Sequence, residues 1–183
     1  MLRSQAIVLL SGGIDSAACA HFLKGQGMMV EGIFFDYGQP AAPREQVAAR
    51  AIAEHLDIQL SVVTLRGPAK HGAGEVRGRN AFLIFGAIVL KPWPAGIVAL
   101  GIHSGTTYYD CSSSFVKATA ALVAEHTDGT LTLLAPFLEW SKKQVYDYFV
   151  SVRLPIELTY SCEAGTEPCA VCHSCRDRSA LGC

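Results

Sequence analysis

The chain has 183 residues, a net charge of −1 at pH 7, 50% hydrophobic residues and 17% charged residues. This composition is typical of a compact globular protein and excludes a disordered one. The near-balanced charge supplies no overall basic field, so a small molecule is the expected partner and a polyanion such as tRNA is not. The longest apolar stretch, residues 81–90, is too short for a bilayer, and the N-terminus does not resemble a signal peptide. We therefore expect a cytoplasmic protein without a membrane partner.

Apolar runs alternate with helical patterns along most of the chain. The expected strands cover residues 6–10, 29–35, 59–65, 97–101 and 130–134, and the expected helices cover residues 16–24, 43–55, 80–90, 113–126 and 141–150. Ser141 and Gln144 have the spacing of a capping box, and Pro43 suits a first helical turn. This alternation predicts an α/β fold with a doubly wound parallel sheet, in which ligands bind beyond the carboxyl ends of the strands.

The longest irregular stretch, residues 66–79, is rich in glycine and basic side chains, among them Lys70. Two interpretations remain open: a solvated linker, or a lid that closes over phosphate groups.

The first expected strand runs directly into Ser11-Gly12-Gly13-Ile14-Asp15-Ser16. Adjacent glycines let the backbone approach a phosphate closely, and the amides of the turn and of the following helix face the anion. The segment lacks the Gly-Lys-Ser/Thr ending of the common P-loop. It resembles the S-G-G-x-D-S signature of the PP-loop ATP pyrophosphatases, which implies a fold of the adenine nucleotide α-hydrolase type and cleavage of ATP between its α- and β-phosphates. The expected ATP-binding residues are Leu10, Ser11, Gly12, Gly13, Ile14, Asp15 and Ser16.

A second motif lies near the C-terminus, where Cys162, Cys169, Cys172 and Cys175 follow the spacing C-x6-C-x2-C-x2-C. Four thiolates so close together can converge tetrahedrally on one Zn²⁺ ion, and a segment this short needs such a metal to fold. An iron–sulfur cluster is the alternative, although the proline that typically follows the last cysteine is absent. We predict a PP-loop nucleotide-binding domain of residues 1–153 and a zinc knuckle of residues 154–183, with His173 solvated.

Two further cysteines lie in the first domain. Cys19 falls on the expected buried side of the first helix, so it is interpreted as a core residue. Cys111 could act as a nucleophile or sulfur carrier, but no histidine adjacent in the sequence would activate it.

The combination of these motifs, from end to end of the chain, resembles the QueC family of 7-cyano-7-deazaguanine synthases. Residues 35–39 read F-D-Y-G-Q and residues 78–80 read G-R-N, as in that family. Tyr109-Asp110-Cys111 with Phe115 is similar to its P-D-C-x-x-x-F, and Ser161 precedes the first cysteine of the knuckle. The resemblance implies a nucleotide and substrate pocket with the candidates Asp36, Tyr37, Gln39, Arg79, Asn80 and Asp110.

The resemblance also implies a reaction. Family members use ATP to activate the carboxylate of 7-carboxy-7-deazaguanine as an acyl adenylate; ammonia gives the amide, and a second activation dehydrates it to the nitrile. Such chemistry needs Mg²⁺ and basic groups around the phosphates, but no covalent nucleophile. The resemblance further implies a homodimer, with which the mean hydropathy of +0.28 is compatible.

Departures from the family pattern leave the amine acceptor open. Residues 40–45 lack the R-H pair that usually follows F-D-Y-G-Q, and residues 101–111 shorten the G-V-N-x-x-D-Y-S-G-Y-P-D-C segment and omit its first acid. One alternative is transfer of the deazaguanine acyl group to a protein amine, as in a QueC-like protein of an antiviral gene cluster, and another is a reaction that stops at the amide. A tRNA-modifying PP-loop enzyme (thiolase or lysidine synthetase) and a non-catalytic nucleotide-binding module are the remaining alternatives.

Overall fold

The computed structural model describes residues 4–68 and 71–183, so Lys70 of the predicted lid lies outside the described residues. The described residues form a five-stranded parallel sheet in the order β3-β2-β1-β4-β5. The strands are β1 (Gln5–Leu9), β2 (Met29–Asp36), β3 (Gln59–Thr64), β4 (Gly96–Ala99) and β5 (Leu131–Leu134).

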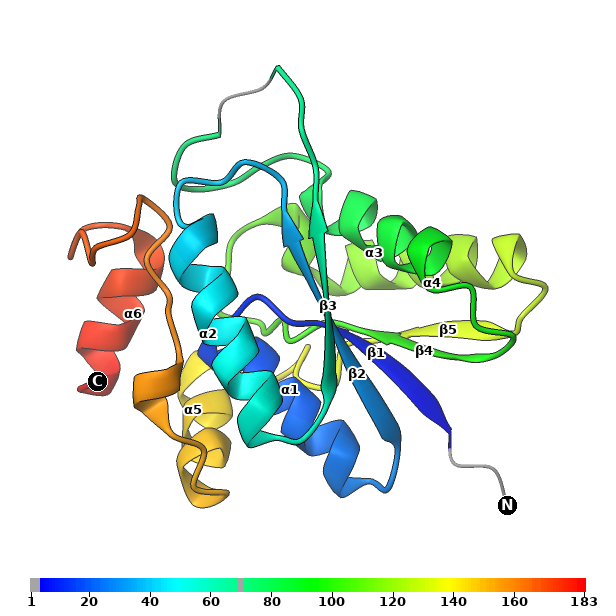
Figure 1. Cartoon of the computed structure of the whole chain (residues 1–183), viewed down its shortest axis with the longest axis horizontal. Coiled ribbons are helices and arrows are strands. Elements are labelled where there is room, and N and C mark those ends of the chain that lie inside the picture. The colour runs from blue at the N-terminus through cyan, green and yellow to red at the C-terminus, as the bar shows by residue number, and fades with distance from the viewer. Residues whose placement is uncertain (1–3, 69–70) are drawn as a thin grey trace.

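Helices cover both faces of this sheet (Figure 1). The helices are α1 (Ile14–Gly25), α2 (Ala42–His55), α3 (Arg79–Leu90), α4 (Ser113–His126), α5 (Lys142–Ser151) and α6 (His173–Leu181), with short 3₁₀ turns at Tyr109–Cys111 and Ile156–Leu158. Helices α1, α2 and α5 share one core, and α3 and α4 share the other. The predicted doubly wound parallel fold is confirmed.

Strand β1 shows why two separate cores form. Successive side chains of a strand point to opposite faces of the sheet. Ala6 and Val8 accordingly belong to the core beneath α1, α2 and α5, whereas Ile7 belongs to the core beneath α3 and α4. A strand buried on both sides reads as a continuous apolar run, which is the pattern on which its prediction depended.

Each expected strand and helix is present, with ends that differ by at most two residues from the expected ones. The capping box at Ser141 and Gln144 is formed, Pro43 lies in the first turn of α2, and Cys19 is fully buried. Helix α6 was not predicted. It buries no residue of its own, so it has no apolar periodicity, and it begins where Cys172 accepts a hydrogen bond from the Cys175 amide.

The strand order reverses at β1, since β2 lies on one side of it and β4 on the other. Ligands of open α/β sheets bind at the carboxyl ends of the strands beside such a reversal. Here the loop after β1 meets the loop after β4. A Cβ on Gly101 would overlap the backbone carbonyl oxygen of Asp15, so only glycine allows this close approach.

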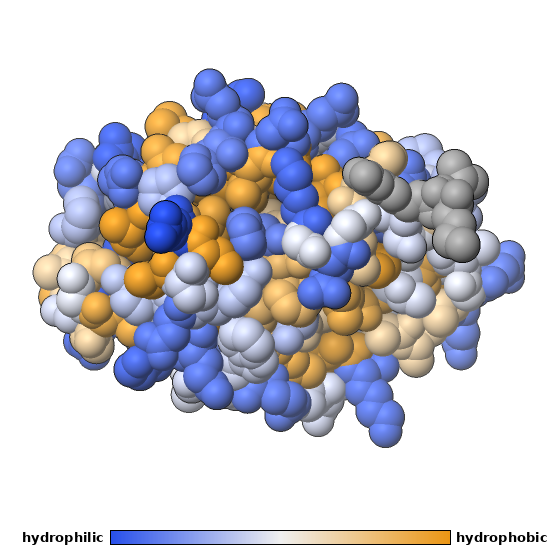
Figure 2. Space-filling model, turned by 90° about the horizontal axis from the view of Figure 1, so that it is seen from below, coloured by the Kyte–Doolittle hydropathy of each residue, from blue (hydrophilic) through white to orange (hydrophobic). Residues whose placement is uncertain are grey.

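Figure 2 shows one face of the molecule, on which polar side chains surround apolar groups. Helix α3 leaves Phe82, Val89 and Leu90 half or more exposed. None of the helices formed by the described residues is long and apolar enough to cross a membrane. The homodimer stays a prediction.

Candidate active site

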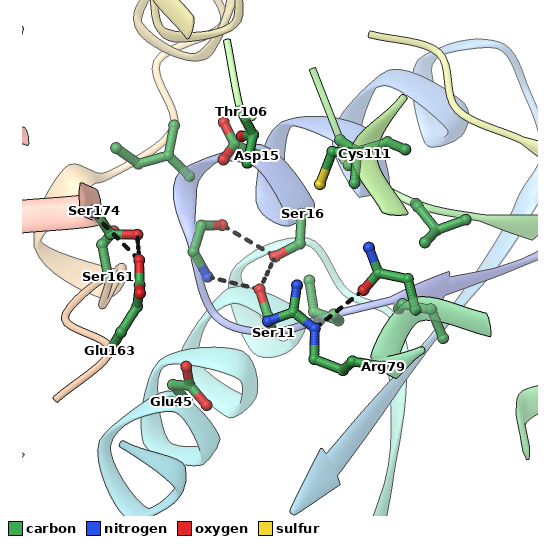
Figure 3. A pocket seen from close by; sticks show the side chains of 18 of the residues that line it. Ser11, Asp15, Ser16, Glu45, Arg79, Thr106, Cys111, Ser161, Glu163 and Ser174 are labelled. Carbon is green, nitrogen blue, oxygen red and sulfur yellow. Dashed lines mark hydrogen bonds between the residues drawn. The ribbon is translucent and has the colours of Figure 1, made fainter. Parts of the chain in front are cut away.

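The loop after β1 is organised by its own hydroxyl groups. The Ser16 hydroxyl donates to the Gly13 carbonyl at 3.1 Å and lies 3.1 Å from the Ser11 hydroxyl, which accepts from the Gly13 amide at 3.4 Å (Figure 3). Gly13 is the N-cap of α1, and no side chain caps the first-turn amides. A helix N-terminus with uncapped amides attracts anions, so the loop has the geometry expected of a phosphate site, and the predicted binding of ATP stays a prediction.

Asp15 lies in the first turn of α1 with two nitrogen-bearing side chains beside it. The Lys142 ammonium group donates to its two carboxylate oxygens, at 2.8 and 2.7 Å. The Nε2 atom of His103 lies 3.8 Å from one of these oxygens. Burial lowers the pKa of His103, although the Asp15 carboxylate acts in the opposite direction. Asp15, Lys142 and His103 therefore form a cluster in which an ion-paired carboxylate lies beside a buried imidazole.

A cavity lies beside the loop after β1 and the Asp15 cluster, and its opposite side is formed by the start of α3. The Arg79 Nε–H group donates to the Asn80 side-chain oxygen at 3.2 Å. Asn80 is held in turn by Asp110, because its backbone amide donates to the Asp110 carboxylate at 3.3 Å and its side-chain amide donates to the Asp110 carbonyl at 3.0 Å. Asp110 thus positions the helix that presents Arg79.

The third side comes from the cysteine-rich segment. One carboxylate oxygen of Glu163 accepts from the Ser174 hydroxyl at 2.6 Å, and the other accepts from the Gly74 amide at 3.0 Å. Figure 3 shows Glu163 and Ser174 across the cavity from Arg79. The carboxylate therefore joins α6 to the loop between β3 and α3 at the edge of the cavity.

The cavity brings together most of the residues that the sequence predicts for it. Gly12, Asp36 and Asp110 are not among its lining residues: Gly12 packs against α2, and Asp36 pairs with Arg66 at 3.3 Å. Their roles in ligand contact stay predictions. The predicted residues that line the cavity are Leu10, Ser11, Gly13, Ile14, Asp15, Ser16, Tyr37, Gln39, Arg79 and Asn80.

The lining residues that sequence reasoning missed include His103, Lys142, Glu163 and Ser174. The capping box did mark the start of α5, and Lys142 is the first residue of that helix. A helix that follows a parallel strand begins near the carboxyl ends of the strands. The position of Lys142 directly after the predicted cap could therefore have indicated a side chain near the site. No comparable signal marks His103 or Glu163.

Two buried groups have shifted acidities. Burial raises the pKa of the Glu45 carboxyl, which accepts a hydrogen bond from the side-chain amide of Gln39 at 2.8 Å. The pKa of the Cys111 thiol is raised to about 12, mainly because the thiol is buried and to a smaller extent because the Asp110 carboxylate lies beside it. A nucleophilic cysteine needs a thiolate, so this environment disfavours the nucleophile interpretation of Cys111.

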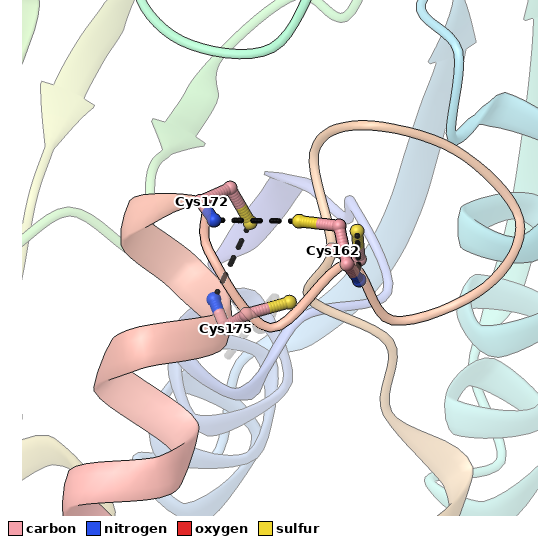
Figure 4. A group of neighbouring side chains, drawn as sticks. Cys162, Cys172 and Cys175 are labelled. Atoms are coloured by element: carbon pink, nitrogen blue, oxygen red, sulfur yellow. Dashed lines mark hydrogen bonds between the residues drawn. The ribbon is translucent and has the colours of Figure 1, made fainter.

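The four predicted metal ligands converge on one point. The sulfur atoms of Cys162, Cys169, Cys172 and Cys175 lie within 4.8 Å of one another (Figure 4). Zinc–sulfur bonds of about 2.3 Å in a tetrahedron place sulfurs about 3.8 Å apart, so the cluster is close to that geometry.

Backbone amides already face several of these sulfurs. The Cys169 amide donates to the Cys162 sulfur, the Cys172 amide to the Cys169 sulfur, and the Cys175 amide to the Cys172 sulfur, at 3.3–3.4 Å. Hydrogen bonds from the Val171 and Cys172 amides lower the pKa of Cys169 to about 6, whereas burial raises that of Cys175 to about 12. A cation bound between the four sulfurs would stabilise all four cysteines as thiolates. The residues therefore fit Zn²⁺.

The fold and the cavity define the class of protein. A parallel sheet with helices on both faces carries an uncapped glycine turn at its switch point, as in PP-loop nucleotide-binding proteins. A predicted subunit of tRNA methyltransferase from Methanocaldococcus jannaschii shares this fold with a TM-score of 0.52 at 17% identity, over 80% of this chain and 74% of that chain.

The family follows from the sequence comparisons. The model of the queuosine biosynthesis protein QueC matches residues 5–74 and 71–181, and the chain belongs to this enzyme family. A 7-cyano-7-deazaguanine synthase of Prochlorococcus marinus (strain NATL2A) is 31% identical, over 97% of this chain and 92% of its own length. One of Synechococcus sp. (strain CC9605) is 34% identical over 98% and 93%, respectively.

Proposed function

We propose that this enzyme uses ATP to adenylate the carboxylate of 7-carboxy-7-deazaguanine and passes the acyl group to ammonia, giving first the amide and then 7-cyano-7-deazaguanine. The observation that carries the proposal is the phosphate-binding turn next to the Asp15–Lys142 pair, in a chain whose relatives are named 7-cyano-7-deazaguanine synthases. The substrate's identity is taken from those relatives.

In the first step, a carboxylate oxygen of the substrate attacks the α-phosphorus of ATP, and the bond to pyrophosphate breaks. The first-turn amides of α1 bind phosphate oxygens, and Lys142 and Arg79 supply positive charge on two sides of the cavity. Asp15 and the Ser11 and Ser16 hydroxyls offer the oxygen ligands that suit Mg²⁺. When bound, that ion would neutralise charge on the phosphates.

In the second step, the nitrogen of ammonia attacks the acyl carbon, AMP leaves and a proton is lost, which yields the amide. The amide oxygen then attacks the α-phosphorus of a second ATP, the bond to pyrophosphate breaks, and the amide nitrogen loses a proton. Loss of AMP and a proton from the adenylated amide leaves the nitrile. These steps need oriented reactants and stabilised phosphate charge, and no thiolate, which agrees with the protonated Cys111 thiol.

The test is incubation of the protein with Mg²⁺, ATP, 7-carboxy-7-deazaguanine and ammonium, with AMP and base products followed by mass spectrometry. The proposal expects AMP and the nitrile base. No AMP, beside an active relative run in parallel, would refute the deazaguanine assignment and return a different PP-loop activity or a non-catalytic module to consideration. The variant Ser16→Ala should lose AMP formation. The control variant His126→Asn should retain it, because His126 is exposed and does not line the cavity.

A protein amine is the second candidate acceptor. The alignment with the Prochlorococcus relative spans 209 residues although this chain has only 183, and the match to the family model divides at residues 71–74, in the loop between β3 and α3. A family match that divides in a loop whose Gly74 lines the cavity supports a difference from the relatives at this side of the site, where an acceptor would enter. AMP release without nitrile, followed by a mass increase on an added lysine peptide, would favour this acceptor over ammonia.

A further inference from the structure

His103 is a buried imidazole whose second nitrogen is without a hydrogen-bond partner among the described residues. Its exposed fraction is 4%, and it lines the cavity. The Gly105 backbone amide donates to its Nδ1 atom at 3.0 Å. The Nε2 atom faces Asp15 at 3.8 Å, which exceeds a hydrogen-bond distance, and Lys142 already donates to both oxygens of that carboxylate.

The contact with Gly105 fixes which nitrogen carries the proton. A backbone amide can only donate, so Nδ1 must accept and is unprotonated. A proton on Nδ1 would point at the Gly105 N–H group, so that two donors would face each other. The ring proton therefore resides on Nε2. The Nε2–H group therefore has no acceptor among the described residues, and it can donate to a ligand bound in the cavity that His103 lines.

The position of His103 indicates which ligand this is. The residue follows β4, on the far side of the switch point from the loop after β1. An anion bound by the first-turn amides of α1 lies beside Asp15, and hence beside Nε2 of His103. We infer that His103 donates a hydrogen bond from Nε2 to a phosphate oxygen of the nucleotide bound in the loop of residues 11–16. This inference rests on the proposed use of ATP.

The imidazole is held in place by its neighbours. Ser104 donates its amide and its hydroxyl to the Trp140 carbonyl, at 2.9 and 2.7 Å, which ties the loop after β4 to the segment just before α5. A Cβ on Gly105 would lie 3.0 Å from both Nδ1 and Cε1 of His103, tighter than ordinary packing. The variant Gly105→Ala should thus displace the imidazole without altering its chemistry.

The first experiment reads the protonated nitrogen directly. Protein labelled with ¹⁵N-histidine is studied by long-range ¹H–¹⁵N correlation, with the His103 signals assigned through the variant His103→Asn. We expect an unprotonated Nδ1 and a protonated Nε2, and a shift of the Nε2 signal when Mg²⁺ and α,β-methylene-ATP are added. A proton on Nδ1, or a silent Nε2 signal while calorimetry shows nucleotide binding, would overturn the inference alone. If calorimetry shows no binding, both the inference and the proposed function fail.

The second experiment measures the affinity for α,β-methylene-ATP, which cannot be cleaved between its α- and β-phosphates. His103→Ala should weaken binding about 10- to 100-fold, the range for a lost hydrogen bond to a charged group. Gly105→Ala should weaken it in the same direction. His103→Asn, whose side-chain amide can still donate, should restore most of the affinity, and the control His126→Asn should leave it unchanged. Equal affinity of His103→Ala and the unaltered protein would contradict the inference.

Discussion

Gly12 offers the sharpest test of how the phosphate-binding turn is held. Its φ angle is +85°, in the left-handed region that favours glycine. A Cβ at this position would lie 2.5 Å from the Glu45 carbonyl oxygen, 2.9 Å from the Ala48 Cβ and 3.0 Å from the Ala49 amide nitrogen. Two of these three atoms belong to the backbone of α2, which no side-chain rotation can move.

Two costs add in the variant Gly12→Ala. The left-handed backbone costs a residue with a Cβ about 1–2 kcal/mol. Forcing a methyl group against α2 adds about 1–3 kcal/mol, the usual penalty of overpacking. We therefore expect the free energy of unfolding to fall by about 2–5 kcal/mol. Relief of the overlap moves the turn away from α2, so nucleotide affinity should fall as well.

Urea denaturation of Gly12→Ala and of Gly25→Ala provides the measurement and its control. Gly25 ends the same helix α1, and a Cβ there meets no atom within 4 Å. Alanine at this site should leave the free energy of unfolding unchanged or raise it by up to about 1 kcal/mol. A loss below about 1 kcal/mol for Gly12→Ala would refute the packing argument.

Three further predictions concern the site and the knuckle. Lys142→Met leaves the Asp15 carboxylate without its partner and should lower kcat/KM for ATP about tenfold or more, whereas Lys143→Met, which removes only an exposed pair with Asp147, should not; equal kinetics in the two variants would contradict the role of Lys142. The Cys111 thiol, with a pKa of about 12, stays protonated at pH 8, so Cys111→Ala should retain kcat within about threefold, and a loss of 100-fold would restore the nucleophile interpretation. Elemental analysis should find one zinc per chain, and Cys169→Ser should lower that content and expose the amides of α6 to hydrogen exchange; a visible iron–sulfur absorbance would contradict zinc. The same exchange experiment tests the predicted boundary between residues 1–153 and 154–183.

Local signals explain what could be predicted for the fold. The doubly buried strands produce continuous apolar runs, and the covering helices produce one-sided ones, so every strand and the first five helices could be located. The glycine turn and the four cysteines were recognisable because their chemistry depends on spacing within one short segment. Helix α6 escaped because it buries no residue and is held by the cysteine cluster.

The sequence by itself therefore determined the strands and helices of the sheet fold, the glycine turn after β1 and the set of four converging cysteines, because each depends on residues close together in the chain. Only the tertiary structure decided what faces that turn. Lys142 lies 127 positions from Asp15, yet the two side chains are in contact. The contacts by which Asp110 holds Asn80 also join segments 30 positions apart. His103 also became a candidate ligand contact only once β4 was placed beside β1. Such pairings depend on strand order and on the packing of loops at the carboxyl ends, and no periodicity or local spacing records them.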